Sequence, residues 1–304
     1  MYTEDCQSIF NGKLKKKYLA SYYDINFVKV SFFETENYFL KDDTYLGLKY
    51  QMWDEIFFEQ IGSVFIENME NELLLHNCNQ VFFRIVPKIS YSANDYKKLD
   101  LLLSSGYAMT TGLVNILRID TSDKRMWTKL RKSYKNLINK EKKILTYSII
   151  DSNNIKDNEN NFLNWIDLYS SAIKRGNRFL TNEMIDTQRE MIESNRAFLV
   201  IAYQNKEPVS GVMFDITEKK AYYSLSATLL TIETKNRAVS HYLIWKSLEY
   251  MVNINIEWLE FGAINYRNEV FHKADMKNIN ISQFKKGFGG EIVPVFYMSK
   301  TLGD

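Results

Sequence analysis

The stretch 280–291 reads Asn-Ile-Ser-Gln-Phe-Lys-Lys-Gly-Phe-Gly-Gly-Glu and joins a Phe-Lys pair to three closely spaced glycines. Because glycine has no β-carbon, such a turn lets the backbone approach a ligand closely. Lys285 lies just before the turn, next to Phe284. On these residues alone, Lys285 is either a cation held beside a ligand or a solvated loop lysine.

A second informative stretch, 127–135, reads Trp-Thr-Lys-Leu-Arg-Lys-Ser-Tyr-Lys. Apolar residues recur at helical spacing in and after it: Trp127, Leu130, Tyr134, Leu137 and Ile138. This period predicts a helix over 125–143. Arg131 falls inside the apolar stripe of that helix, so its guanidinium must snorkel, pair with a carboxylate or face a ligand. A phosphate-bearing acceptor would suit its bidentate geometry, and a structural ion pair is the alternative.

Together these stretches resemble the FK-x-GFGG ending and the W-x-x-L-R-K-S helix of the FemAB family in the GNAT acyltransferase superfamily. The resemblance implies an α/β fold with two GNAT-like domains, mixed sheets flanked by helices, that face each other across a cleft. It also places the Phe284-Lys285 pair at the transfer site. Acyl transfer to an amine passes through a tetrahedral oxyanion, which needs a cation or hydrogen-bond donor aimed at that oxygen, and we predict that Lys285 supplies this cation. Family members move aminoacyl groups from charged tRNA to peptidoglycan precursors, and looser relatives in polysaccharide pathways use acyl-CoA or another donor.

The order of predicted elements agrees with this fold. Strands are expected at 26–33, 80–86, 112–119 and 145–151, with helices at 50–75 and 94–105. Helices at 161–174 and 182–194, a hairpin over 198–216, a strand at 221–226, a helix from Ser240, and strands at 258–261 and 291–299 follow. We expect domains at 1–120 and 121–304, and the family analogy allows the last strand to pack back on the first domain.

The amino-acid composition excludes several classes of function. The chain has 304 residues and a net charge of +2, too weak a global field to indicate a nucleic-acid binder, so any basic site is local. Two cysteines and three histidines are too few for a disulfide framework or a His-rich metal centre, and no metal is expected. No apolar h-region follows the N-terminal lysines, and no apolar run is long enough to span a membrane, so we expect a cytosolic protein.

Further candidate residues surround the expected site. Glu260 ends a predicted strand, and Tyr266 and Arg267 follow it in a loop; loops after strand carboxyl ends line ligand crevices in α/β sheets. Glu260 or Tyr266 could take the amine proton, directly or through water, and an ordinary strand carboxylate is the alternative for Glu260. The remaining substrate-binding candidates are Arg131, Lys135, Arg175, Arg178, Arg237, Ser240 and Arg267, with Ser240 also predicted to cap its helix.

The sequence does not decide between acyl-CoA and aminoacyl-tRNA as the donor. Residues 234–240 lie where a CoA-binding GNAT has a Gly-rich loop for pyrophosphate, and they contain no glycine. Nor does any segment have the length or heptads of the tRNA-associated helical arm that some relatives carry. We therefore predict an acyltransferase that forms an amide between an acyl-CoA or aminoacyl-tRNA donor and an amine on a nucleotide- or lipid-linked cell-envelope sugar or peptide precursor. The alternatives are a non-catalytic GNAT-like binding protein and an RNA-binding module that uses the basic helix 124–143.

Overall fold

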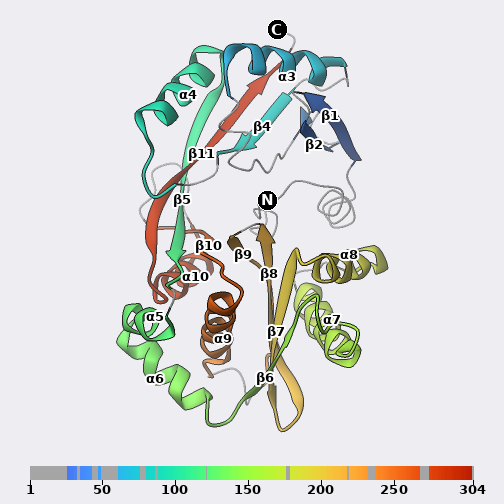
Figure 1. The fold of residues 1–304 in the computed structure, drawn as a ribbon, viewed down its shortest axis with the longest axis vertical. Helices are drawn as coiled ribbons and strands as arrows, with labels where there is room; N and C mark the ends of the chain where they lie inside the picture. Colours follow the sequence, from blue (N-terminus) through green and yellow to red (C-terminus); the bar gives the residue numbers. More distant parts are fainter. Residues whose placement is uncertain are drawn as a thin grey trace. The chain divides into compact units, whose positions relative to one another are not determined.

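The structure is a computed structural model (Figure 1). It describes residues 26–32, 35–42, 47–48, 61–75, 80–85, 88–120, 122–175, 179–217, 219–231, 237–267 and 274–302. The chain folds into two compact units, one built on Asn115–Glu291 and the other on the described residues of Ile9–Val114 and Ile292–Asp304. The predicted cleft and the boundary at residue 120 stay predictions.

The unit built on Asn115–Glu291 is a mixed sheet covered by helices. Its strand order is β5-β10-β9-β8-β7-β6. The strands are β6 (Thr146–Ile150), β7 (Ala197–Gln204), β8 (Glu207–Thr217), β9 (Lys220–Thr228), β10 (Trp258–Ala263) and the end of β5 (Ala108–Arg118). The pairs from β6 to β9 are antiparallel, whereas β9 and β10 are parallel. The predicted hairpin is therefore confirmed.

Helices cover both faces of this sheet. Figure 1 shows α7 and α8 on one side of β7 and β8, and α9 on the other. The helices of the unit are α5 (Asp123–Lys129), α6 (Lys132–Glu141), α7 (Glu159–Lys174), α8 (Asn182–Glu193), α9 (Val239–Asn253) and α10 (Met276–Lys286). Six consecutive residues of β7 are buried, because a strand between two helical layers has no solvent face. Phe198, Phe214, Phe261 and Phe288 lie in the core that α9 closes.

The other unit has strand order β4-β11-β5, with β4 (Gln80–Arg84) antiparallel to β11 (Glu291–Thr301). Its described helices are α3 (Ser63–Leu75) and α4 (Ala93–Ser104), and a separate antiparallel sheet holds β1 (Asn26–Phe32), β2 (Thr35–Asp42) and β3 (Gly47–Leu48). Phe65, Met69, Leu102, Tyr107 and Met298 share its core. Most of β11 belongs to this unit, although β11 follows all the strands of the other unit in sequence.

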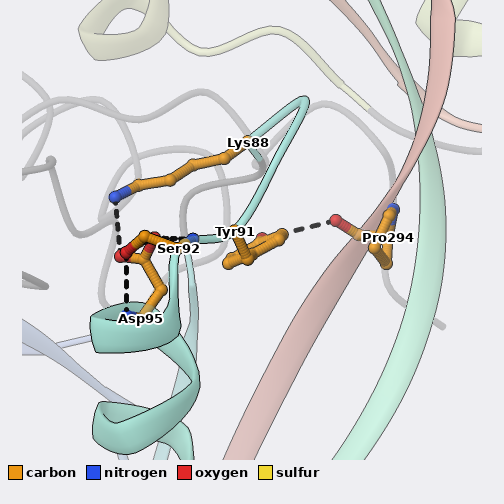
Figure 2. A network of polar contacts seen from close by, with 5 residues as sticks. All are labelled: Lys88, Tyr91, Ser92, Asp95 and Pro294. Carbon is orange, nitrogen blue, oxygen red and sulfur yellow. Dashed lines mark hydrogen bonds and ion pairs between the residues drawn. The ribbon is translucent and has the colours of Figure 1, made fainter.

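A polar network fixes the start of α4 (Figure 2). The Ser92 hydroxyl accepts from the Asp95 amide, and the Asp95 carboxylate accepts from the Ser92 amide, which is a capping box. Lys88 donates to the same carboxylate at 2.9 Å, and these hydrogen bonds lower the pKa of Asp95 despite its burial. Tyr91 donates to the Pro294 carbonyl at 3.5 Å, which ties the loop before α4 to β11. At the other end of α4, Gly106 has φ +88, a conformation that favours glycine, and the helix ends just before it.

Three local predictions are wrong. The helix expected over 125–143 is two helices, because the chain turns extended at Leu130 and Arg131 between α5 and α6. Residues 276–286, for which no helix is predicted, form α10, with the Asp275 side chain accepting from the Asn278 amide at its start. The cap of α9 is Ala238, and Ser240 lies inside the helix.

Candidate functional site

The Phe-Lys pair lies in the last turn of α10, and the glycines follow it directly. Lys285 is only 2% exposed. Its ammonium donates to the backbone carbonyl of Ala263 at 3.1 Å. The neighbouring Gly262 has φ +80, a conformation that favours glycine. The interpretation of Lys285 as a solvated lysine is therefore wrong, since the charge is buried against the end of β10.

This end of β10 is where the parallel pair separates. The register between β10 and β9 covers only Trp258–Glu260 against Lys220–Tyr222. Glu260 is the last β10 residue in register with β9 and is 6% exposed, and Ala263 lies three residues beyond it. The structure thus places a buried cation and a buried carboxylate on or against the same short strand. Buried charges are costly unless they are paired, and such groups cluster at functional sites.

Tyr134 connects the two motif-bearing segments. Its hydroxyl donates to the carbonyl of Phe284 at 3.1 Å, and the amide of Arg131 donates to the Gly287 carbonyl at 3.0 Å. A β-carbon on Gly287 would lie 2.1 Å from Cε2 of Tyr134. Burial raises the pKa of Tyr134, against the opposing influence of the Arg131 guanidinium. The start of α6 therefore packs directly on the end of α10 and holds the turn that follows Lys285.

The two later glycines are held from β5. The Asn115 side chain is 1% exposed and donates to the Gly289 carbonyl at 3.1 Å. A β-carbon on Gly290, whose φ is +91, would lie 2.4 Å from the Asn115 amide oxygen. Asn115 was not among the residues predicted from the sequence. The sequence feature that points to Asn115 is an amide side chain inside an otherwise apolar strand, because a buried amide needs a specific hydrogen-bond partner.

An aromatic cluster surrounds His241 beside this turn. The imidazole lies 4.3 Å from the Tyr134 ring and 4.9 Å from the Phe284 ring, both edge to face. Its Nδ1 is buried and has no hydrogen-bond partner among the residues that the structure describes. Burial lowers the pKa of His241 to about 4, although Glu141 acts in the opposite direction. His241 is therefore neutral at physiological pH and packs as an aromatic side chain.

A buried carboxylate lies at the start of α9. Glu141, at the end of α6, is 2% exposed. One oxygen accepts from the Ala238 amide at 3.2 Å, and the other accepts from Nε of Arg237 at 3.1 Å and from its Nη2. Arg237 also donates to the side chain of Gln204. The positive end of a helix favours an anion, and here a side chain of the protein supplies it. Glu141 was not among the residues predicted from the sequence.

The other predicted residues lie in varied surroundings. Tyr266 is 37% exposed, and its ring lies 4.8 Å from the ammonium of Lys286. Arg267 follows it and is exposed. Arg131 is an exposed residue before α6, with its guanidinium 5.5 Å from the Tyr134 ring, so its expected place in an apolar stripe is wrong.

Two further candidates contact the backbone. Lys135 donates to the Thr128 carbonyl at 3.2 Å. Arg175, at the end of α7, donates to the Thr228 carbonyl at 3.2 Å at the end of β9. Arg178 lies outside the described residues.

Within the described ranges, no group of three or more His, Cys, Asp or Glu residues could hold a metal ion. A search of the same residues finds no helix long and apolar enough to cross a membrane.

Solved structures share this fold. FemX matches with a TM-score of 0.63 at 12% identity, over 97% of this chain and 96% of that one. L-PGS from Bacillus licheniformis matches with a TM-score of 0.60 at 12% identity, over 94% and 87% of the two chains. A tandem GNAT protein from the clavulanic acid biosynthesis pathway matches with a TM-score of 0.51 at 11% identity, over 88% and 79%. No family model and no curated protein sequence matches the chain. The chain therefore shares the fold of FemX and of the tandem GNAT protein.

Proposed function

We propose that the chain is an acyltransferase that forms an amide between an activated acyl or aminoacyl donor and an amine on a cell-envelope sugar or peptide precursor. The observation that carries this proposal is the buried ammonium of Lys285, held on the Ala263 carbonyl where β9 and β10 stop pairing. The fold shared with FemX and with a tandem GNAT protein supports the same class of reaction.

The chemistry requires few groups. The amine nitrogen attacks the donor carbonyl carbon, and negative charge collects on the carbonyl oxygen until the leaving group departs. A cation in a dry, pre-formed position stabilises that oxygen far better than one in water. The Ala263 carbonyl anchors Lys285, so the ammonium need not reorganise during the reaction. Glu260 or Tyr266 accepts the proton that the amine loses, directly or through water.

The donor we favour is an aminoacyl ester of tRNA. A CoA thioester bound in the usual GNAT manner needs the amides at the start of the central helix for its pyrophosphate. In this chain the Glu141 carboxylate already accepts from the Ala238 amide and pairs with Arg237. A pyrophosphate at that helix end would have to displace Glu141 from the Ala238 amide and from Arg237. The acceptor we propose is a nucleotide- or lipid-linked precursor, and we propose that the enzyme acts in the cytoplasm.

Intact-mass analysis of a donor panel tests the proposal. The protein is incubated with acyl-CoAs or with charged tRNA, each with UDP-linked sugars or envelope-precursor extracts as acceptors. We expect an acceptor to gain the mass of an amino acid only when charged tRNA is present. Lys285→Ala should abolish the gain, and Lys277→Ala, an exposed lysine on the same helix, should preserve it. A gain with CoA donors alone would overturn the donor assignment.

The second candidate is a non-catalytic binding protein with the same fold. The start of α9 favours this second candidate. The Glu141 carboxylate already accepts from the Ala238 amide, so that amide does not bind a donor. This candidate predicts no mass gain with any donor, together with saturable binding of a precursor that Lys285→Ala leaves unchanged.

A further inference from the structure

Helix α10 holds the backbone at the end of β10 by two side chains that lie one helical turn apart. The Lys285 ammonium donates to the Ala263 carbonyl at 3.1 Å, and the Ser282 hydroxyl accepts from the Asn265 amide at 2.8 Å. Residues three apart lie on the same face of a helix, so both side chains reach the same short segment. The register between β10 and β9 has already ended there, and α10 fixes the segment in its place.

The Ser282 hydroxyl uses both of its hydrogen-bonding functions. The side chain is 0% exposed, and its hydroxyl donates to the Asn278 carbonyl at 2.8 Å. A carbonyl can only accept and an amide N–H can only donate, so the two roles of this hydroxyl are fixed. An alanine here would fill nearly the same volume, but it would leave the Asn265 amide without this acceptor.

The segment held by Ser282 contains the anchor of the proposed oxyanion cation. The Ala263 carbonyl, two residues before the Asn265 amide, accepts from the Lys285 ammonium. Tyr266 has its own contact with α10 through Lys286, whose ammonium lies 4.8 Å from the tyrosine ring. The contact made by Ser282 therefore bears mainly on the carbonyl that holds Lys285.

We propose that Ser282 is a positioning residue for acyl transfer. Through the Asn265 amide it fixes the Ala263 carbonyl, and that carbonyl fixes the Lys285 ammonium. Stabilisation of an oxyanion requires a pre-formed donor, and a misplacement of about 1 Å can lower the rate by about 10²-fold. The inference rests on the proposed function, because the exact place of the ammonium affects a rate only where an oxyanion forms.

A second buried serine provides a matched control. Ser247 in α9 is also 0% exposed, and its hydroxyl donates to the Leu243 carbonyl at 2.9 Å, four residues earlier as in Ser282. Among the residues that the structure describes, no amide of another segment donates to it. Ser282→Ala and Ser247→Ala thus remove the same atoms and the same type of helical bond, and only the first removes the contact with Asn265. Assays well below both melting temperatures keep the variants folded.

Chemical labelling reports on Lys285 without any turnover. The protein is treated with acetic anhydride, and peptide fragmentation gives the rate at each lysine. Lys285 is 2% exposed and should react slowly, whereas the exposed Lys277 on the same helix serves as the internal reference. Relative to Lys277, the Lys285 rate should rise about fivefold or more in Ser282→Ala and stay within about twofold in Ser247→Ala. An unchanged rate in Ser282→Ala would overturn the inference.

The kinetic measurement uses a donor and acceptor pair that gives a mass gain with the unsubstituted protein. Ser282→Ala should lower kcat about tenfold or more with little change in KM, because the loss falls on the transition state. In a Lys285→Met background the same substitution should change kcat by less than about threefold, since it acts through the ammonium. An equal loss in both backgrounds, or an equal loss in Ser247→Ala, would contradict the proposal.

The two measurements separate this inference from the proposed function. If no donor gives a mass gain, the proposed function fails, while faster labelling of Lys285 in Ser282→Ala still assigns the placement of the ammonium to Ser282. If the enzyme is active and labelling accelerates without a change in kcat, the positioning role is wrong and the proposed function stands.

Discussion

The ring of Tyr134 occupies the space that a side chain on Gly287 would need, because a β-carbon there would lie 2.1 Å from Cε2 of Tyr134. The same tyrosine donates its hydroxyl to the carbonyl of Phe284, one residue before Lys285. The two segments that carry the FemAB resemblance are therefore one packed unit in space. Residue 287 must be glycine because of the neighbouring Tyr134 ring, and not because of its own backbone, whose φ is not positive.

We expect Gly287→Ala to destabilise the protein by about 1–3 kcal/mol, the usual cost of overpacking. Tyr134→Ala alone should also destabilise it, by opening a cavity. In the double variant the two losses should be less than additive, because the smaller residue 134 makes room for the new methyl group. Urea denaturation of the four proteins measures this coupling. Strictly additive losses would show that the Tyr134 ring does not limit the size of the side chain at residue 287.

Lys285→Met should separate stability from catalysis. The methionine keeps most of the side-chain volume but leaves the Ala263 carbonyl without its donor, so we expect a moderate loss of stability of about 1–3 kcal/mol. Turnover should fall by roughly 10²–10³-fold, the range found when one oxyanion donor is lost. The rate of acceptor mass gain and a thermal melt are the two measurements, with Lys277→Met as the control. A large loss of stability with unchanged turnover would assign Lys285 a structural role.

His241 should make the fold sensitive to acid. Its pKa is about 4 in the folded protein and 6.5 in its unperturbed state, so the unfolded chain binds the proton more readily. The contribution of neutral His241 to the free energy of unfolding is fully present above pH 6.5 and is lost as the pH falls toward 4. The total loss is on the order of 3 kcal/mol. Urea denaturation between pH 4 and 7 measures it. His241→Phe should flatten this part of the curve relative to the unsubstituted protein, and an identical pH dependence in both would refute the assignment.

Glu141→Ala should cost about 3–5 kcal/mol, because it leaves the Arg237 guanidinium half-buried without its counter-charge. Adding Arg237→Ala should recover part of this loss, since both charges are then absent. Equilibrium denaturation of the two single variants and the double variant gives the coupling. If the double variant is as unstable as the sum of the single ones, the ion pair does not couple the end of α6 to the start of α9.

By itself, the sequence determined the elements whose residues alternate or recur at a clear period. The strands β7 and β8, the helices α7 and α8, the capping Thr181 and the glycine stop at Gly106 follow from local propensity and spacing. The Phe-Lys pair was selected by its resemblance and by its glycines. These features depend on neighbours within a few residues, which a sequence displays directly.

Only the tertiary structure decided the rest. The polar segment 276–286 is a helix because Asp275 caps it and Tyr134 packs on its end, and its own periodicity is weak. Apolar residues recur at helical spacing on both sides of Leu130 and Arg131, so the pattern shows no sign that the helix breaks there. The break is stabilised by the hydrogen bond from the Arg131 amide to the Gly287 carbonyl. Glu141 is buried by a partner 96 residues away, and Lys285 by a carbonyl 22 residues away. Burial of a charge depends on long-range partners, and spacing along a chain does not encode which partners those are.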